Sequence, residues 1–394
     1  MQHILAVSEL EVGLVGVTRS VSGATDRVAS LDVFRGTTMI LMLYVDVCGD
    51  LIPFFGHATW NGLHIADFVM PAFLFAVGAS TYLTMNRGFG VKPKRTVLLD
   101  ASHRALRMFI LGVFVQGKWI PSGDGSKDWI GFDLYSFRIM GILQRIGICY
   151  LLLSLVVLYL PTRNLRCFAI AMAVNIQVAI YLFIRVPGCP NNADFSVSCN
   201  SQSWIDRLVL GTNHLYRDGY DPEGLVSTLG CLLPCFVGFM SIEYRGINLR
   251  IRASVSLVLV FCGLGLICVS RVPFNKALWT LPYNLVTTGT VSLVFSFLDS
   301  FDIKTPKSNV LVHLGSNAIF FFVFSDCCGV GSAVLNSVYS TREGRRVGMV
   351  NWFLSDILGV ESHPGNIVVF ATIQVWFYLV LTGYMYRRGI FYRV

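Results

Sequence analysis

Residues 57–80 read HATWNGLHIADFVMPAFLFAVGAS, a polar segment that runs directly into an apolar one. Residues 57–67 contain two histidines, a tryptophan, an asparagine and an aspartate, whereas the following residues form a run long enough to cross a bilayer as a helix. Ionisable groups beside such a run are costly and usually serve a function. The stretch therefore predicts a membrane-spanning helix with a functional site at one end.

The composition of the chain is that of a membrane protein. Of its 394 residues, 54% are hydrophobic and only 14% are charged, whereas a soluble domain has about 25% charged residues. The apolar runs are continuous rather than alternating, which excludes a β-barrel. We therefore expect an all-α, polytopic membrane protein that has membrane lipids as partners.

We expect about ten transmembrane helices, each bounded by loops that contain charged or turn-forming residues. The spans lie near 33–50, 64–85, 105–120, 138–160, 166–186, 225–243, 253–270, 277–298, 308–325 and 366–386. Nine or eleven spans also fit the sequence, because the third span is short and 326–365 is ambiguous.

The basic residues predict the orientation of these spans. The formal net charge is +8, and most Lys and Arg side chains fall in segments that share one side of the ten-span topology. The positive-inside rule then places both termini in the cytosol. This predicts a cytosolic segment at 1–29 and a transmembrane domain at 30–394 with a lumenal loop at 187–224. Because the charges lie in short loops between spans, no nucleic-acid partner is expected.

Two cysteines predict a disulfide. Cys189 and Cys199 lie ten residues apart in the loop that faces the lumen or the outside, where disulfides persist. No Cys or His spacing resembles a zinc site, so we expect no metal.

His57 and Asp46 form the candidate catalytic pair. A lone loop histidine is more often structural or solvated, but Asp46 lies in the outer part of the first span, where an unpaired carboxylate is disfavoured. A carboxylate beside an imidazole fixes its tautomer and raises its basicity, which suits proton abstraction or nucleophilic attack. We expect Asp46 to orient His57.

Three other residues near the membrane are candidates for a supporting role. Asp67 supports the site or, alternatively, stabilises the N-terminus of the second span. Asn61 supports it or simply forms a turn with Gly62. Arg145, inside the fourth span, is expected to face the bundle interior and to bind a carboxylate or an anionic ligand.

These segments resemble a known family. RVASLDVFRGTTMILMLYVDVCGD, residues 27–50, together with residues 57–80, is similar to the core of the heparan-α-glucosaminide N-acetyltransferase family. The similarity continues in RIMGILQRIGICY, VPGCP, WIDRLVLGTNHLYRDGYDPEGLVST, VPFNKALWTLPYNLVTTG and YRRGIFYRV.

The resemblance implies an acyltransferase. Such an enzyme moves the acetyl group of cytosolic acetyl-CoA, a co-substrate, to a terminal glucosamine of heparan sulfate in the lysosomal lumen. It implies that His57 is the active-site histidine, either acetylated itself or acting as a base in a ternary complex. It also suggests a homodimer in the lysosomal or another endomembrane, with the plasma membrane as an alternative.

The resemblance also suggests binding residues on each side of the membrane. Candidates for the amino-sugar acceptor are Asp221, Glu223 and His214; candidates for CoA are Arg145, Arg104 and Arg107. The alternative for the YDPEG segment at 220–224 is a rigid turn before the sixth span. For the basic residues the alternative is positive-inside signalling.

The sequence departs from the family pattern at two points. Asp46 stands where the animal lysosomal enzyme has an asparagine, and we expect no counterpart here of the N-terminal lumenal domain of the family and the span that follows it. The same chemistry on another glycan or a lipid-linked sugar is one alternative function. A transporter with Asp46, Asp67 and His57 as a proton relay is another, although no internal repeat supports it.

Overall fold

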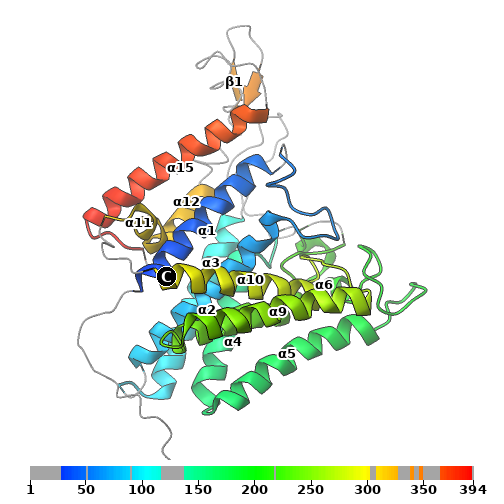
Figure 1. Ribbon diagram of the computed structural model, residues 1–394. Helices are drawn as coiled ribbons and strands as arrows, with labels where there is room; N and C mark the ends of the chain where they lie inside the picture. Colours follow the sequence, from blue (N-terminus) through cyan, green and yellow to red (C-terminus); the bar gives the residue numbers. More distant parts are fainter. Residues whose placement is uncertain are drawn as a thin grey trace, which may run out of the picture.

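The computed structural model is a bundle of tilted helices (Figure 1). The structure describes residues 28–49, 52–88, 91–116, 137–216, 219–301, 308–326, 338–340, 346–348 and 364–392. The described helices are α1 Ala29–Cys48, η1 Ile65–Phe68, α2 Val69–Gly88, α3 Lys94–Val115, α4 Ile142–Tyr159, α5 Arg163–Phe183, α6 Ser201–Leu210, η2 Thr212–His214, α7 Leu225–Gly230, α8 Leu232–Glu243, α9 Leu249–Ser270, α10 Leu281–Ser300, α11 Val310–Ser316, α12 Ala318–Asp326 and α15 Pro364–Arg387.

A small β-hairpin accompanies the helices. Strands β1 Val338–Ser340 and β2 Arg346–Gly348 pair antiparallel, with Tyr339 opposite Val347. The hairpin falls in the region that the sequence left ambiguous. The all-α prediction therefore holds for the bundle but omitted this element, because three-residue strands carry too little periodicity to be recognised.

Seven described helical segments are long and apolar enough to cross a membrane. They are Ile65–Arg87, Ile142–Tyr159, Arg163–Phe183, Leu225–Glu243, Leu249–Ser270, Leu281–Ser300 and Ile367–Arg387. Helix α1 carries Asp32, Arg35 and Asp46, and the α11–α12 segment is interrupted at Asn317. The helical membrane class is thus confirmed, whereas the count of about ten spans and their orientation remain predictions.

The predicted third and sixth spans differ from the helices observed. Helix α3 begins at Lys94, whereas the predicted span begins near residue 105. The prediction missed the first turns of α3 because they are polar and carry no continuous apolar signal. The sixth span consists of α7 and α8 with a break at Cys231. Pro234 has no N–H to donate to the carbonyl four residues earlier. Asn284 Nδ2 donates to that carbonyl, Gly230 O, at 2.8 Å instead.

Helix α2 lies at the centre of the bundle, against α8 and α4. Two glycines bring the backbones of α2 and α8 together: a Cβ at Gly78 would lie 1.7 Å from Cys235 O, and one at Gly238 would lie 2.0 Å from Phe75 O. Small residues allow this close approach, which is common between membrane helices. The contact fixes α2 and the η1 turn that precedes it.

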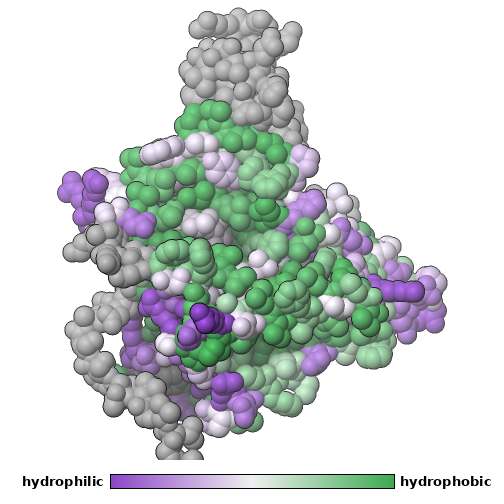
Figure 2. Space-filling view, viewed as in Figure 1, coloured by the Kyte–Doolittle hydropathy of each residue, from purple (hydrophilic) through white to green (hydrophobic). Residues whose placement is uncertain are grey.

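Apolar side chains cover the middle of the surface, whereas polar ones gather at its left and right ends (Figure 2). Helix α9 presents Val258 and Phe261, which are 59% and 66% exposed, and Phe168 on α5 and Trp376 on α15 are exposed as well. Helices with apolar outer faces are expected against lipid. The loop at 271–280, after α9, lies beside the segment that precedes η1.

Candidate functional site

His57 is held by Asp67. Its Nδ1 lies 2.8 Å from Asp67 Oδ1, and the His57 side chain is 45% exposed whereas that of Asp67 is 1% exposed. An ionised carboxylate only accepts hydrogen bonds, so Nδ1 carries the hydrogen and donates it. The neutral ring therefore has its lone pair on Nε2, the nitrogen that can act as a base or a nucleophile.

Asp67 both orients His57 and caps the segment that contains it. Its Oδ2 accepts the His64 backbone N–H at 2.9 Å, at the start of η1. Its own carbonyl oxygen accepts a hydrogen bond from Tyr283 Oη of α10 at 2.7 Å. The first bond fixes the carboxylate and the second fixes the backbone of Asp67, so the predicted helix-terminus contact is present, whereas its role in catalysis remains a prediction.

Asn61 anchors the loop rather than facing an open space. Asn275 Nδ2 donates to Asn61 Oδ1 at 3.1 Å, and the Gly62 N–H donates to Phe274 O at 2.8 Å. Trp60 Nε1 donates to Phe195 O at 2.7 Å. These bonds join the loop of His57 to two segments that are distant in sequence.

Lys276 is a site residue that sequence reasoning missed. Its Nζ lies 3.2 Å from His57 Nδ1 and 3.3 Å from His57 Nε2. These near-equal distances place Nζ beside both ring nitrogens rather than in line with the lone pair of Nε2. In the sequence Lys276 is one basic residue in a loop between two predicted spans. Its position in the family-like segment VPFNKALW was the one signal that could have identified it.

Burial lowers the pKa of Lys276, because removing an ammonium group from water disfavours its charged form. The charges of Glu223 and Asp67 oppose this effect, that of Arg145 adds to it, and that of Asp46 opposes it. The amine therefore loses its proton more readily than a solvated lysine does.

Asp46 lies near the end of α1 with an exposed side chain. The carboxylate that bonds to His57 is that of Asp67, which we expected only to support the site. The segment that carries His57 lies against the start of η1, so the Asp67 carboxylate contacts the His57 ring. The number of residues between two positions does not predict such a contact. A catalytic role for Asp46 remains a prediction.

The YDPEG segment is locked by an arginine. Arg138 Nε donates to Asp221 Oδ2 at 2.9 Å and Nη2 to Oδ1 at 2.5 Å, and Nη2 also pairs with Glu223. Burial opposes ionisation of Glu223, but Arg138, Arg145 and Lys276 outweigh it and hold the pKa of Glu223 below its usual range. Both carboxylates are buried, as a rigid turn requires, and acceptor binding by them remains a prediction.

Arg145 holds the same turn from the other side. Its Nη2 donates to Pro222 O at 2.9 Å and to Ser227 Oγ, and its guanidinium lies 5.3 Å from the ring centre of Trp279. Among the described residues, its buried Nε has no hydrogen-bond partner. The sequence correctly predicted that Arg145 faces the interior; CoA binding by it remains a prediction.

The contacts of the other candidate binding residues do not involve His57. Arg104 lies over the ring of Tyr150 at 4.9 Å, and Arg107 is exposed on α3. His214 Nδ1 lies 2.7 Å from Phe137 O. Protein contacts thus position Arg104 and His214, and ligand binding by all three residues remains a prediction.

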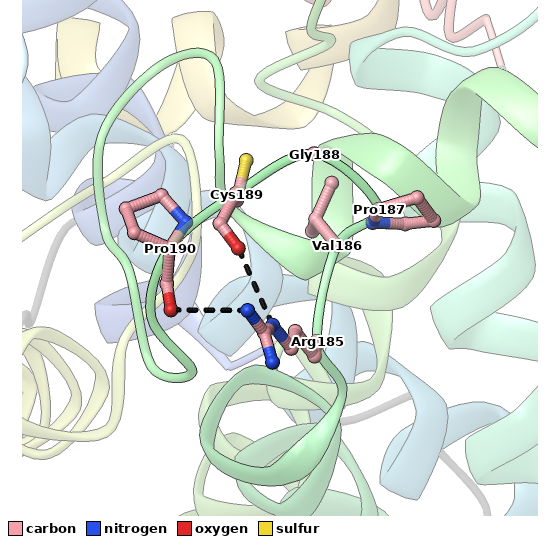
Figure 3. A pocket seen from close by; sticks show the side chains of 6 residues that line it. All are labelled: Arg185, Val186, Pro187, Gly188, Cys189 and Pro190. Atoms are coloured by element: carbon pink, nitrogen blue, oxygen red, sulfur yellow. Dashed lines mark hydrogen bonds between the residues drawn. The ribbon is translucent and has the colours of Figure 1, made fainter.

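The loop after α5 is closed by a disulfide between Cys189 and Cys199, whose Cα atoms are 5.8 Å apart. Arg185 lines a surface hollow in this loop and donates to Cys189 O and Pro190 O, each at 3.3 Å (Figure 3). The same loop receives the hydrogen bond from Trp60, so the disulfide supports the segment beside His57. In the part of the chain that the structure describes, no group of three or more His, Cys, Asp or Glu side chains could hold a metal ion.

Comparisons with known proteins agree with the family resemblance. A family model described as heparan-alpha-glucosaminide N-acetyltransferase, catalytic, matches residues 27–190. The human protein named heparan-alpha-glucosaminide N-acetyltransferase is 27% identical over an alignment of 443 residues, gaps included. The alignment covers 96% of this chain and 61% of the relative. The mouse protein of that name is 26% identical over 435 residues, with 94% and 61% covered. The resemblance is thus confirmed, and the chain spans about three fifths of the length of these curated relatives.

Proposed function

We propose that this chain is a membrane acetyltransferase that moves the acetyl group of acetyl-CoA to the amine of a terminal amino sugar. The observation that carries the proposal is the His57–Asp67 pair, an exposed imidazole held in one tautomer by a buried carboxylate. The match of residues 27–190 to the acetyltransferase model includes both residues.

The pair supports two routes of acetyl transfer. In the first, His57 Nε2 attacks the thioester carbonyl carbon, the C–S bond breaks, and CoA leaves as the thiolate; the sugar amine then takes the acetyl group and loses a proton. In the second, Nε2 removes a proton from the sugar amine as the amine nitrogen attacks the thioester carbonyl carbon, the C–S bond breaks, and CoA leaves as the thiolate. Asp67 stabilises the positively charged ring that forms in both routes.

The finer features of the proposal rest on the relatives and on the topology. The relatives' printed name makes the terminal glucosamine of heparan sulfate the first acceptor to test, ahead of another glycan or a lipid-linked sugar. With both termini in the cytosol, His57 lies on the lumenal or outer side, across the membrane from a cytosolic supply of acetyl-CoA. A lysosomal or other endomembrane location accords with this arrangement.

Acetyl transfer by purified protein tests the proposal. Wild-type protein in detergent is incubated with radiolabelled acetyl-CoA and glucosamine, or with a panel of amino-sugar glycans, and acetylated sugar and free CoA are measured. We expect wild type to form both products and His57→Ala to form neither.

His103→Ala is the matched control, because His103 is an exposed histidine of α3, and it should retain activity. A wild-type protein that releases no CoA with any amino sugar would contradict the proposed function. Label trapped on the protein by acid, and absent from His57→Ala, would select the acetyl-histidine route.

A further inference from the structure

Lys276 places a cation beside the nitrogen at which the proposed chemistry occurs. Its Nζ lies 3.3 Å from His57 Nε2. An ammonium in this position attracts developing negative charge, yet a lysine is not required to orient His57, because Asp67 already does so through Nδ1.

Acetyl transfer creates negative charge beside Nε2 in both routes. When a nucleophile adds to the acetyl carbonyl carbon, the π electrons move onto the carbonyl oxygen. In the first route the acetyl carbonyl carbon is bonded to Nε2, and in the second it is attacked by an amine that Nε2 deprotonates. In both routes the acetyl oxygen therefore lies within reach of Lys276 Nζ, which is 3.3 Å from Nε2. Hydrogen-bond donors aimed at such an oxygen are often the largest contribution to catalysis.

We propose that Lys276 is a second catalytic residue, whose ammonium donates a hydrogen bond to the acetyl oxygen as negative charge develops there. The inference rests on the proposed acetyl transfer and adds a residue to it. No proton moves from Lys276: the oxygen regains its double bond as the C–S bond breaks and CoA leaves as the thiolate.

The loop that carries Lys276 is fixed before any substrate arrives. Asn275 Oδ1 accepts the Leu278 N–H at 2.8 Å, and Asn275 Nδ2 donates to Asn61 at 3.1 Å. Gln177 Nε2 of α5 donates to Leu278 O at 2.9 Å. Trp279, fully buried, has a φ of 50°, a strained value for a tryptophan. Strain that persists in such a framework is typical of functional sites, and a preset donor needs no reorganisation during reaction.

Substitution of Lys276 separates an oxyanion donor from a structural cation. Lys276→Met should lower kcat about 100-fold, the usual loss for one oxyanion donor, with little change in the KM for acetyl-CoA. Arg271→Met is the matched control: it removes the same charge from an exposed side chain of the same loop, and kcat should be unchanged.

The pH profile provides a second readout. The groups that act on Lys276 are His57 and Asp67 of the site segment, Glu223 before α7, Arg145 of α4 and Asp46 of α1. Burial holds the pKa of Lys276 below its usual range, so wild-type activity should fall on the alkaline side as the amine loses its proton. Lys276→Arg should retain most of the activity and move this fall to higher pH, since a guanidinium stays protonated.

The outcomes distinguish this inference from the proposed function. Wild type without acetyl transfer would contradict the function itself. An active wild type, with a kcat for Lys276→Met equal to its own or an alkaline fall that Lys276→Arg does not move, would overturn the role of Lys276 alone. Thermal unfolding of each variant checks folding, and if Lys276→Met fails to fold, the pH profile of Lys276→Arg decides the question.

Discussion

The carboxylate of Asp206 joins helices α6 and α7. It lies in α6, is buried, and its Oδ1 accepts the Leu225 N–H at 3.0 Å at the start of α7. Burial raises the pKa of Asp206 to about 6, although the N–H groups of Val226 and Leu225 partly offset this effect. The folded protein therefore favours the protonated carboxyl, the form present in an acidic compartment.

This pKa predicts that Asp206 favours folding at acidic pH. A folded-state pKa above the unfolded one means that the contribution of Asp206 to stability is greatest below about pH 4 and declines as pH rises to about 6, by about 2–3 kcal/mol in total. Asp206→Asn removes this dependence, so it should gain thermal stability relative to wild type between pH 4 and pH 7. Asp100→Asn, at an exposed carboxylate of α3, is the control. A stability difference between Asp206→Asn and wild type that does not change with pH would contradict the prediction.

Individual site residues could be predicted from sequence only where their chemistry was unusual for their location. His57 and Asp67 stood out because polar groups beside an apolar run are costly. Lys276 did not, because a lysine in a loop is ordinary, and its proximity to His57 depends on the pairing of Asn275 with Asn61 across more than 200 residues. Asp46 was favoured for the same reason as Asp67, and only the fold distinguishes them.

Helices were predictable as elements, but their breaks and joins were not. Continuous apolar runs marked α2, α4, α5, α9, α10 and α15 because each must satisfy its own backbone within lipid. The break between α7 and α8 depends on Asn284 replacing the donor that Pro234 lacks. The site itself lies in the loops between helices, and their positions follow from contacts such as Trp60 to Phe195 rather than from local sequence.

The face of the bundle seen in Figure 2 has an apolar middle and polar ends, as is expected of a membrane protein. If about ten spans are right, both chain termini face the cytosol and the Cys189–Cys199 loop faces the opposite side. Protease-sensitive tags at both termini of the protein in intact, sealed vesicles of known orientation should then be cleaved or protected together. Cleavage of one tag with protection of the other would require an odd number of spans.

Acetyl transfer by Asp67→Asn and Asp46→Asn, measured side by side as kcat with acetyl-CoA and an amino sugar, tests most directly whether the His57–Asp67 pair performs the chemistry. Loss of the orienting carboxylate from a catalytic histidine lowers kcat by about 10⁴ where it has been measured. We predict a loss approaching that size for Asp67→Asn and retained activity for Asp46→Asn, which leaves the bond from His57 Nδ1 to Asp67 in place. Full activity in Asp67→Asn, with the loss in Asp46→Asn instead, would contradict the site described by the structure.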